Sequence, residues 1–352
     1  MNNYVSLRNL FLIILLSITI SINGQLPEPG DTIYVANWNV ENLFDTMDDP
    51  KTNDSEFLPT SPKEWNQEKF ERKLNNLVRV INYMNDGCGP DLLGFEEVEN
   101  INVLKFLSYK LPDRDYIIAH RDSPDARGID ASLIYDRSIF DIVEIVPIHV
   151  EIPTGYSTRD ILHVTLLHKR SNTKLHVFVN HWPSRRGGEE KSEPNRIAAA
   201  KCLRSAVDSL LKLSADTQII ILGDFNDEPN NISIEETLHA KDFNCSDKKF
   251  NSSMLLNLSY KKFSENQGSY LYRTDWNMID QIIVSQTLDD GKGLEYKCGS
   301  FEIVKPEFMI VKSGDRKGGP LATFAGSKYL GGYSDHFPVA AKFYLINEKE
   351  CN

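Results

Sequence analysis

Two short stretches in the second half of the chain place polar side chains directly after apolar, strand-like runs. One reads I-L-G-D-F-N-D-E-P and contains Asp224 and Asn226, and the other reads Y-S-D-H-F-P-V and contains Asp335 and His336. A packed core would favour Val or Leu at such positions. Carboxylates, amides and imidazoles at strand ends can instead bind a metal ion or transfer a proton. Both stretches are therefore candidate parts of a catalytic site.

Four more polar residues occupy comparable positions. Asn39, Glu97 and His181 each follow a strand-like segment, and Asp280 lies inside the apolar run M-I-D-Q-I-I. If the strands of a sheet deliver their ends to one rim, these side chains converge. Oxygen ligands of this kind suit a hard divalent cation better than zinc. The pattern predicts a divalent-metal site, with Mg²⁺ expected first and Mn²⁺ or Ca²⁺ as alternatives.

The expected chemistry is hydrolysis of a phosphoester, whose transition state gathers negative charge on the phosphoryl oxygens. Glu97 is predicted to hold the metal, with help from Asn39 and Asp335. The spacing of Asp224 and Asn226 puts both side chains on one face of an extended segment, which suits a pair that holds and deprotonates a water molecule. The sequence thus separates metal-binding groups from water-activating groups.

The two histidines have different expected partners. His336 needs an acidic neighbour to stay oriented or charged, and Asp280 is the candidate. His181, in N-H-W-P, can donate to a phosphate oxygen. Each residue alone also has a structural explanation, because a single Asp after a strand is commonly a turn residue and a buried His is commonly a satisfied core group. The whole set taken together favours catalysis, while a non-catalytic binding module that retains the fold is the alternative of another class.

Periodicity indicates the elements that carry these residues. Alternating, β-branched-rich stretches predict strands, and apolar residues at helical spacing predict two helices, the first with Ser61 as N-cap. The predicted strands are 32–40, 92–98, 131–135, 161–167, 175–180, 218–222, 278–284 and 339–346, and the helices span 61–84 and 196–213. Several strands are too close in sequence for helical crossovers, so we expect an α/β protein with a mixed sheet and outer helices. No linker divides residues 25–352, which are expected to form one catalytic domain.

The motif order resembles that of the endonuclease/exonuclease/phosphatase superfamily over roughly residues 33–345. The motifs that carry the resemblance are W-N-V-E-N-L-F, G-F-E-E-V-E, N-H-W-P-S-R, L-G-D-F-N-D-E-P, M-I-D-Q-I-I-V-S and Y-S-D-H-F-P-V. The resemblance implies a four-layer sandwich of two mixed β-sheets packed face to face with helices outside and the site at one end. It also implies that Asp224 activates water, that His336 with Asp280 assists the phosphoryl group, and that Glu97 anchors the metal. Many members have Gln-Glu where this chain has Glu96-Glu97, which leaves the role of Glu96 open.

Three arginines are candidates for binding the substrate. Arg127 and Arg159 precede predicted strands and look like family positions that line the substrate cleft. Arg185 follows the His181 motif and could grip a phosphate with two parallel hydrogen bonds. Ordinary surface arginines are the alternative for all three.

The amino terminus indicates the compartment. Arg8 precedes an apolar run of about 13 residues, Leu10 to Ile22, which is short for a membrane span and typical of a secretory signal peptide. We expect cleavage near Gly24, a secreted or periplasmic protein, no stable membrane anchor and a monomer. Export permits disulfides, but the five cysteines include no C-x-x-C pair, and their pairing stays open.

The substrate is the least determined feature. The net charge of −11 gives no general attraction to polyanions, although a metal-neutralised groove needs only local positive charge. Export and scattered basic pairs favour an extracellular or periplasmic endonuclease. A phosphatase or phosphodiesterase for inositol phosphates or phospholipid head groups is the alternative.

Overall fold

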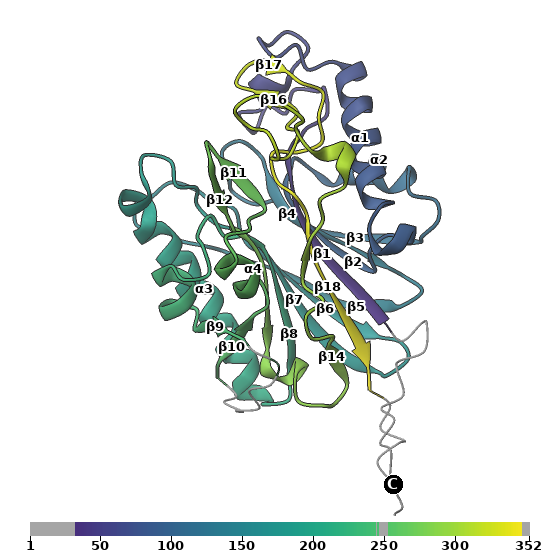
Figure 1. The fold of residues 1–352 in the computed structure, drawn as a ribbon, viewed down its shortest axis with the longest axis vertical. Coiled ribbons are helices and arrows are strands. Elements are labelled where there is room, and N and C mark those ends of the chain that lie inside the picture. The colour runs from purple at the N-terminus through teal and green to yellow at the C-terminus, as the bar shows by residue number, and fades with distance from the viewer. Residues whose placement is uncertain (1–31, 244, 246–252, 347–352) are drawn as a thin grey trace, which may run out of the picture.

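The computed structural model describes residues 32–243, 245 and 253–346; the predicted signal peptide lies outside them. Two seven-stranded mixed sheets pack face to face, and helices cover both outer faces (Figure 1). This is the four-layer sandwich expected from the motif resemblance. No helix within the described ranges is both long and apolar enough to cross a bilayer.

The first sheet has the strand order β14-β18-β1-β2-β4-β3, with β15 also paired to β18. Its strands β1 and β2 run parallel and its other pairs are antiparallel. The strand bounds are β1 (Thr32–Leu43), β2 (Leu92–Val98), β3 (Tyr116–His120), β4 (Asp130–Asp136), β14 (Leu294–Tyr296), β15 (Glu302–Ile303) and β18 (Val339–Leu345).

The second sheet has the order β5-β6-β7-β8-β13-β10-β9, and its parallel pairs are β7 with β8 and β9 with β10. The strand bounds are β5 (Phe140–Ile148), β6 (Ile161–His168), β7 (Thr173–His181), β8 (Gln218–Asp224), β9 (Ala240–Asp242), β10 (Leu255–Asn257) and β13 (Asp280–Ser285). Two small hairpins lie outside the large sheets: β11 (Tyr270–Tyr272) with β12 (Asp275–Asn277), and β16 (Phe324–Ala325) with β17 (Lys328–Tyr329).

Alternation along the strands builds three apolar layers. In β1, Ile33 and Val35 face the second sheet, while Tyr34 and Trp38 face the helices on the other side. Because both faces of the central strands are buried, the sheets are held from two sides and their ends are fixed in space. A third cluster fills the space between the outer face of the second sheet and the long helix α3.

Four α-helices complete the described fold. Helices α1 and α2 cover the first sheet, and α3 covers the second (Figure 1). The bounds are α1 (Gln67–Ile81), α2 (Ile101–Tyr109), α3 (Glu189–Leu213) and α4 (Tyr260–Ser264), with short helical turns at Ser55–Phe57, Asn85–Gly87, Ser233–Thr237, Gln286–Leu288 and Glu307–Met309.

The first predicted helix begins later than its Ser-Pro-Lys-Glu stretch suggested. Ser61 is in a turn, Glu64 has a left-handed φ of 46°, and Asn66 is the N-cap, whose side chain accepts a hydrogen bond from the Lys69 amide. The side chain of Trp65 explains the delay, because it is fully buried and its indole donates to the Phe44 carbonyl. Burying this indole fixes the chain before the helix can start.

Candidate active site

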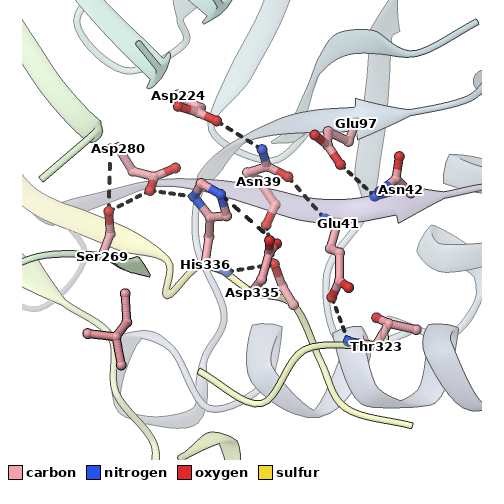
Figure 2. Close-up of polar contacts among 12 residues, drawn as sticks. Asn39, Glu41, Asn42, Glu97, Asp224, Ser269, Asp280, Thr323, Asp335 and His336 are labelled. Atoms are coloured by element: carbon pink, nitrogen blue, oxygen red, sulfur yellow. Dashed lines mark hydrogen bonds and ion pairs between the residues drawn. The ribbon is translucent and has the colours of Figure 1, made fainter. Parts of the chain in front are cut away.

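The ends of three neighbouring strands bring predicted site residues into direct register. Asp224 ends β8, and the residues opposite it on the two flanking strands are His181 on β7 and Asp280 on β13. All three side chains are buried, and Asn39 of the facing sheet donates from Nδ2 to Asp224 Oδ2 at 3.0 Å (Figure 2). The sheet ladders therefore place four of the predicted site residues together.

The backbone departs from regular strand geometry at this end of the first sheet. The β1–β2 ladder shifts register between Asn39 and Leu43, and Glu41, Asn42 and Glu97 all have left-handed φ values between 52° and 62°. Non-glycine residues rarely adopt this conformation, and such bulges re-aim side chains. Here the bulges let Glu97 Oε2 accept a hydrogen bond from the Asn42 amide at 2.9 Å (Figure 2).

The His336 imidazole is held by a carboxylate and by an aromatic ring. Its Nδ1 lies 2.8 Å from Asp280 Oδ2, which also accepts a hydrogen bond from the Ser269 hydroxyl, and the Tyr270 ring is 4.7 Å from the imidazole ring. Burial by itself lowers the pKa of His336, but the carboxylate of Asp280, followed by those of Asp335 and Asp224, raises it well above its usual value. The imidazole is therefore a cation with its Nε2 free of Asp280.

Asp224 has the environment of a base. Its Oδ1 accepts the Asn226 amide at 2.9 Å, and Asn226 itself has a left-handed φ of 50°. Burial and the neighbouring Asp280 carboxylate raise the pKa of Asp224 to about 7, against the opposing effect of His336. A carboxylate that titrates near neutrality can accept a proton from water.

His181 differs from His336 in charge. Burial, and then the Arg159 and Arg127 guanidinium groups, lower its pKa well below its usual value, so the ring is neutral. Its Nε2 lies 3.7 Å from Asp224 Oδ2 and 3.9 Å from Glu97 Oε1, while its buried Nδ1 has no hydrogen-bond partner. A neutral imidazole here is free to donate to, or accept from, a molecule that enters the site.

A family model described as the endonuclease/exonuclease/phosphatase family matches residues 34–345, nearly the whole described chain. The chain belongs to this family. Membership makes it a phosphoesterase and agrees with the motif order in the sequence. A search of curated proteins finds no match.

Solved structures share the fold of this family member at low sequence identity. The human Nocturnin catalytic domain aligns with a TM-score of 0.56 and 17% identity over 90% of this chain and 95% of that one. A Bacteroides thetaiotaomicron protein of the same family gives 0.55 and 17% over 90% and 98%. The mannosyl-6-phosphatase of that bacterium gives 0.54 and 18% over 89% and 100%. At such identities the likeness shows the fold alone.

The family depends on a divalent metal, and the donors at this end of the endonuclease/exonuclease/phosphatase fold suit one. The backbone amide of Asn42 bonds only Oε2 of Glu97, which leaves Oε1 available to a metal. Burial and the charge of Glu97 raise the pKa of Asp335, and the charge of His336 opposes this rise. Two carboxylates that repel each other are what a divalent cation would neutralise. Among the described residues, Asp224, Asp280 and His336 have potential ligand atoms within 4.8 Å of one another at this end of the sheets. The assignment of Asn39, Glu97 and Asp335 as metal ligands stays a prediction.

The three predicted substrate arginines have different surroundings. Arg127 is half-exposed, 3.5 Å from Asp125. Arg159 is buried and donates to Asp125 and the Trp182 carbonyl, with its Nε unpartnered. Arg185 is turned towards the loop after β8, where it donates to the Asn226 carbonyl at 2.8 Å. As phosphate contacts, all three remain predictions.

Asp227 anchors the loop that carries Asn226. Its Oδ1 lies 2.7 Å from Nε of Arg196 on α3, its Oδ2 accepts the Ser233 hydroxyl at 2.6 Å, and both charged side chains of the pair are almost completely buried. The sequence motif predicted roles for Asp224 and Asn226 but none for Asp227. No spacing rule connects it to Arg196, because only the packing of α3 on the sheet brings them together.

Sequence reasoning also missed Glu41 and Lys73. The buried Glu41 carboxylate accepts the backbone amides of Thr323 and Phe324, and the buried Lys73 ammonium on α1 donates to Thr323 Oγ1 and the Tyr333 carbonyl. Burial lowers the pKa of Lys73 to about 8 despite the nearby acids. These bonds tie α1 and β1 to the segment that leads to Asp335. In the sequence, a Lys on the apolar face of a predicted helix was the one sign that Lys73 has a buried partner.

Glu96, whose role the sequence left open, points between the sheets. It is fully buried, one oxygen accepts from Asn37 Nδ2 at 3.1 Å, and burial, followed by the charges of Asp280 and Asp224, raises its pKa well above the usual value. It is therefore a protonated group beneath the site, whereas Glu97 faces the rim.

Proposed function

We propose that this phosphoesterase is a secreted, Mg²⁺-dependent phosphodiesterase that cleaves nucleic acid as an endonuclease. The catalytic part of this proposal rests on two neighbouring buried side chains, one suited to accept a proton and the other to carry a positive charge. Asp224 titrates near pH 7 and can accept a proton, while Asp280 keeps His336 protonated beside it. A base and a cation side by side are what an in-line attack of water on a phosphodiester requires.

Each group then has one task. Asp224 orients a water molecule and takes its proton, with Asn39 and Asn226 fixing the carboxylate. His336, oriented by Asp280, donates to the phosphoryl group as negative charge develops. A divalent cation held by Glu97, Asp335 and Asn39 would supply the positive charge that further stabilises the phosphoryl oxygens.

The nucleic-acid assignment draws on the β11–β12 hairpin. Tyr270 of this hairpin packs on His336, and two positions on, Tyr272 is 53% exposed, with the Arg273 guanidinium 5.3 Å from its ring centre. Aromatic faces beside guanidinium groups stack on nucleobases and contact the backbone without reading sequence. The hairpin therefore offers a base-stacking platform next to the catalytic histidine.

The proposal of export draws on the cysteines. Cys245 and Cys298 form a disulfide with a Cα–Cα distance of 6.0 Å across 53 residues of sequence. Structural disulfides are typical of oxidising compartments, in agreement with the signal peptide predicted for residues 1–24. Sequencing the amino terminus of protein recovered from the periplasm or medium tests this, and an intact Met1 would refute cleavage.

A second candidate is a phosphatase for small phosphate monoesters, which one observation favours. The Nε of Arg316 is buried without a hydrogen-bond partner, and its guanidinium lies close enough to Asp335 and Tyr270 to oppose the rise in pKa that burial causes in both groups. The guanidinium is only partly paired, because its Nη2 donates to the Leu271 carbonyl at 3.4 Å, so its Nε could hold a terminal phosphate. A structural neighbour in the same family is a mannosyl-6-phosphatase.

One experiment separates the candidates. The purified protein is assayed with Mg²⁺, Mn²⁺, Ca²⁺ or chelator on plasmid DNA, RNA, bis-p-nitrophenyl phosphate, and sugar and inositol monophosphates in parallel. Asp224→Ala serves as the inactive variant, and Asp216→Asn, an exposed aspartate before β8, serves as the matched control. Metal-dependent nicking lost only in Asp224→Ala supports the nuclease, whereas release from monoesters alone moves the assignment to a phosphatase. No turnover of any substrate by folded protein would favour a binding module.

A further inference from the structure

A second group of possible ligands lies on the outer, helix-facing side of the first sheet, away from the space between the sheets. His120 ends β3, and Asp130 begins the neighbouring strand β4. Side chains alternate along a strand, so His120 shares a face with Ile118, and Asp130 shares one with Ile134. Both isoleucines pack in the apolar cluster beneath α1 and α2, which identifies this face.

Three side chains meet there. His120 Nε2 lies 3.0 Å from Asp130 Oδ2, and His120 Nδ1 lies 3.8 Å from Asp122 Oδ1. One potential ligand atom from each residue falls within 4.8 Å of the others. His120 and Asp130 are buried, whereas the side chain of Asp122 is 90% exposed. Two buried side chains thus form the floor of the group, and the exposed carboxylate of Asp122 can move over them.

Ser132 gives the independent observation. It is fully buried, and its hydroxyl has no hydrogen-bond partner. In the β3–β4 ladder it lies directly opposite His120, and it is two residues from Asp130 on the same strand, so its side chain emerges on the same face as both. A buried hydroxyl without a hydrogen-bond partner destabilises the fold, and contact with a bound ion or with a water on that ion would remove this penalty.

We propose that His120, Asp122 and Asp130 bind a divalent cation of the zinc type, separate from the catalytic metal. One imidazole nitrogen and two carboxylate oxygens form a mixed nitrogen and oxygen donor set, which suits Zn²⁺ better than Mg²⁺. An imidazole must be deprotonated to bind a metal, so the ligand set of one imidazole and two carboxylates would carry a charge of −2, which one divalent cation neutralises. This inference does not depend on the proposed substrate.

The bound ion would fix the loop between the two strands. That loop, residues 121–129, contains Arg127, which lowers the pKa of the catalytic-site residue His181, and Asp125, which binds Arg159. The ion would replace the 3.0 Å hydrogen bond between His120 Nε2 and Asp130 Oδ2. Asp130 Oδ1 also accepts the Ser123 amide, and the Arg121 guanidinium donates to the His120 carbonyl rather than to a carboxylate. Closing Asp122 onto the ion would pin the start of this loop to the sheet.

Zinc titration calorimetry in saturating Mg²⁺ tests the proposal, because Mg²⁺ occupies the catalytic carboxylates. All proteins carry Cys88→Ser, which removes an exposed thiol that could bind zinc. Asp122→Asn is the decisive variant, since its side chain is exposed and the fold does not need it, and Asp113→Asn is the matched exposed control on the turn before β3. Glu97→Gln reports on the catalytic site.

We expect one tight zinc equivalent in the parent, unchanged by Asp113→Asn and Glu97→Gln. Loss of a direct ligand in Asp122→Asn should weaken binding at least about 10-fold, the lower end of the effect of removing even an indirect partner. His120→Gln, checked for folding by circular dichroism, should abolish it. Absence of zinc binding, equal binding by Asp122→Asn and the parent, or loss of the ion in Glu97→Gln would each overturn the proposal.

Discussion

The buried ion pair between Arg196 and Asp227 should couple stability to catalysis, and replacing Arg196 with Met tests this. The substitution keeps the apolar volume of the side chain and leaves the Asp227 carboxylate buried without its cation. Breaking such a pair from one side costs about 3–5 kcal/mol. Because Asp227 keeps its hydrogen bond from Ser233 and a 3.4 Å contact with Arg185, we expect the lower end, about 3 kcal/mol.

A double-mutant cycle measured by urea unfolding isolates the interaction. Asp227→Asn alone strands the buried Arg196 cation, whereas the double variant removes both charges. The double variant should therefore be less destabilised than the sum of the single variants by about 2 kcal/mol or more. In a chain of this length, Arg196→Met should lower Tm by about 4 °C.

The same variant should lose activity. Asp227 follows Asn226 directly and lies three residues after Asp224, so a shift of this loop displaces the groups that hold the water. A misplacement of about 1 Å can cost about 10²-fold in rate, and we expect a fall in kcat of about 10- to 100-fold at a temperature where the variant is folded. Additive unfolding free energies, or full kcat in a destabilised Arg196→Met protein, would refute the reasoning.

Three further outcomes are expected. Asp280→Asn keeps the shape of the side chain but removes the charge that orients His336, so kcat should fall about 10²- to 10⁴-fold with an unchanged circular dichroism spectrum; activity within about 3-fold of the parent would contradict this role. Glu97→Gln should raise the Mg²⁺ concentration for half-maximal rate at least about 10-fold, and an unchanged Mg²⁺ titration would exclude Glu97 as a ligand. Burial and the charges of Asp289 and Asp290 raise the folded-state pKa of Glu295 to about 7, so wild-type stability is lost relative to Glu295→Gln as pH rises from about 4.5 to 7. Partial solvent screening limits this difference to about 1–2 kcal/mol, and urea unfolding at pH 4 and pH 8 should show it only at pH 8.

The sequence predicted the positions of residues that depend on strand periodicity. Asp224 and His181 each follow an apolar run whose alternation defines the strand, and the structure pairs them across β7 and β8. The four-layer fold followed from motif order. The local sequence pattern was sufficient here, because residues at matching positions on paired strands lie next to each other in the sheet.

Residues whose role depends on the packing of distant elements were not predictable. Lys73 reaches Thr323 from 250 residues away, and Glu41 reaches the same segment from β1. The start of α1 was misplaced because a burial requirement at Trp65 outweighed the local capping signal. The predicted metal ligands present a related difficulty, since the bulges that aim Glu97 are backbone irregularities that side-chain alternation does not encode.

The pairing of the first and last long strands has a practical consequence. Thr32 at the start of β1 lies opposite Tyr344 near the end of β18, while Asn39 and His336 stand at the other end of the same pair. A tether attached at either end of the described chain would therefore leave the catalytic rim pointing outward. Immobilised on a bead through a terminal tag, the enzyme should hydrolyse its phosphoester substrate as readily as it does in free solution.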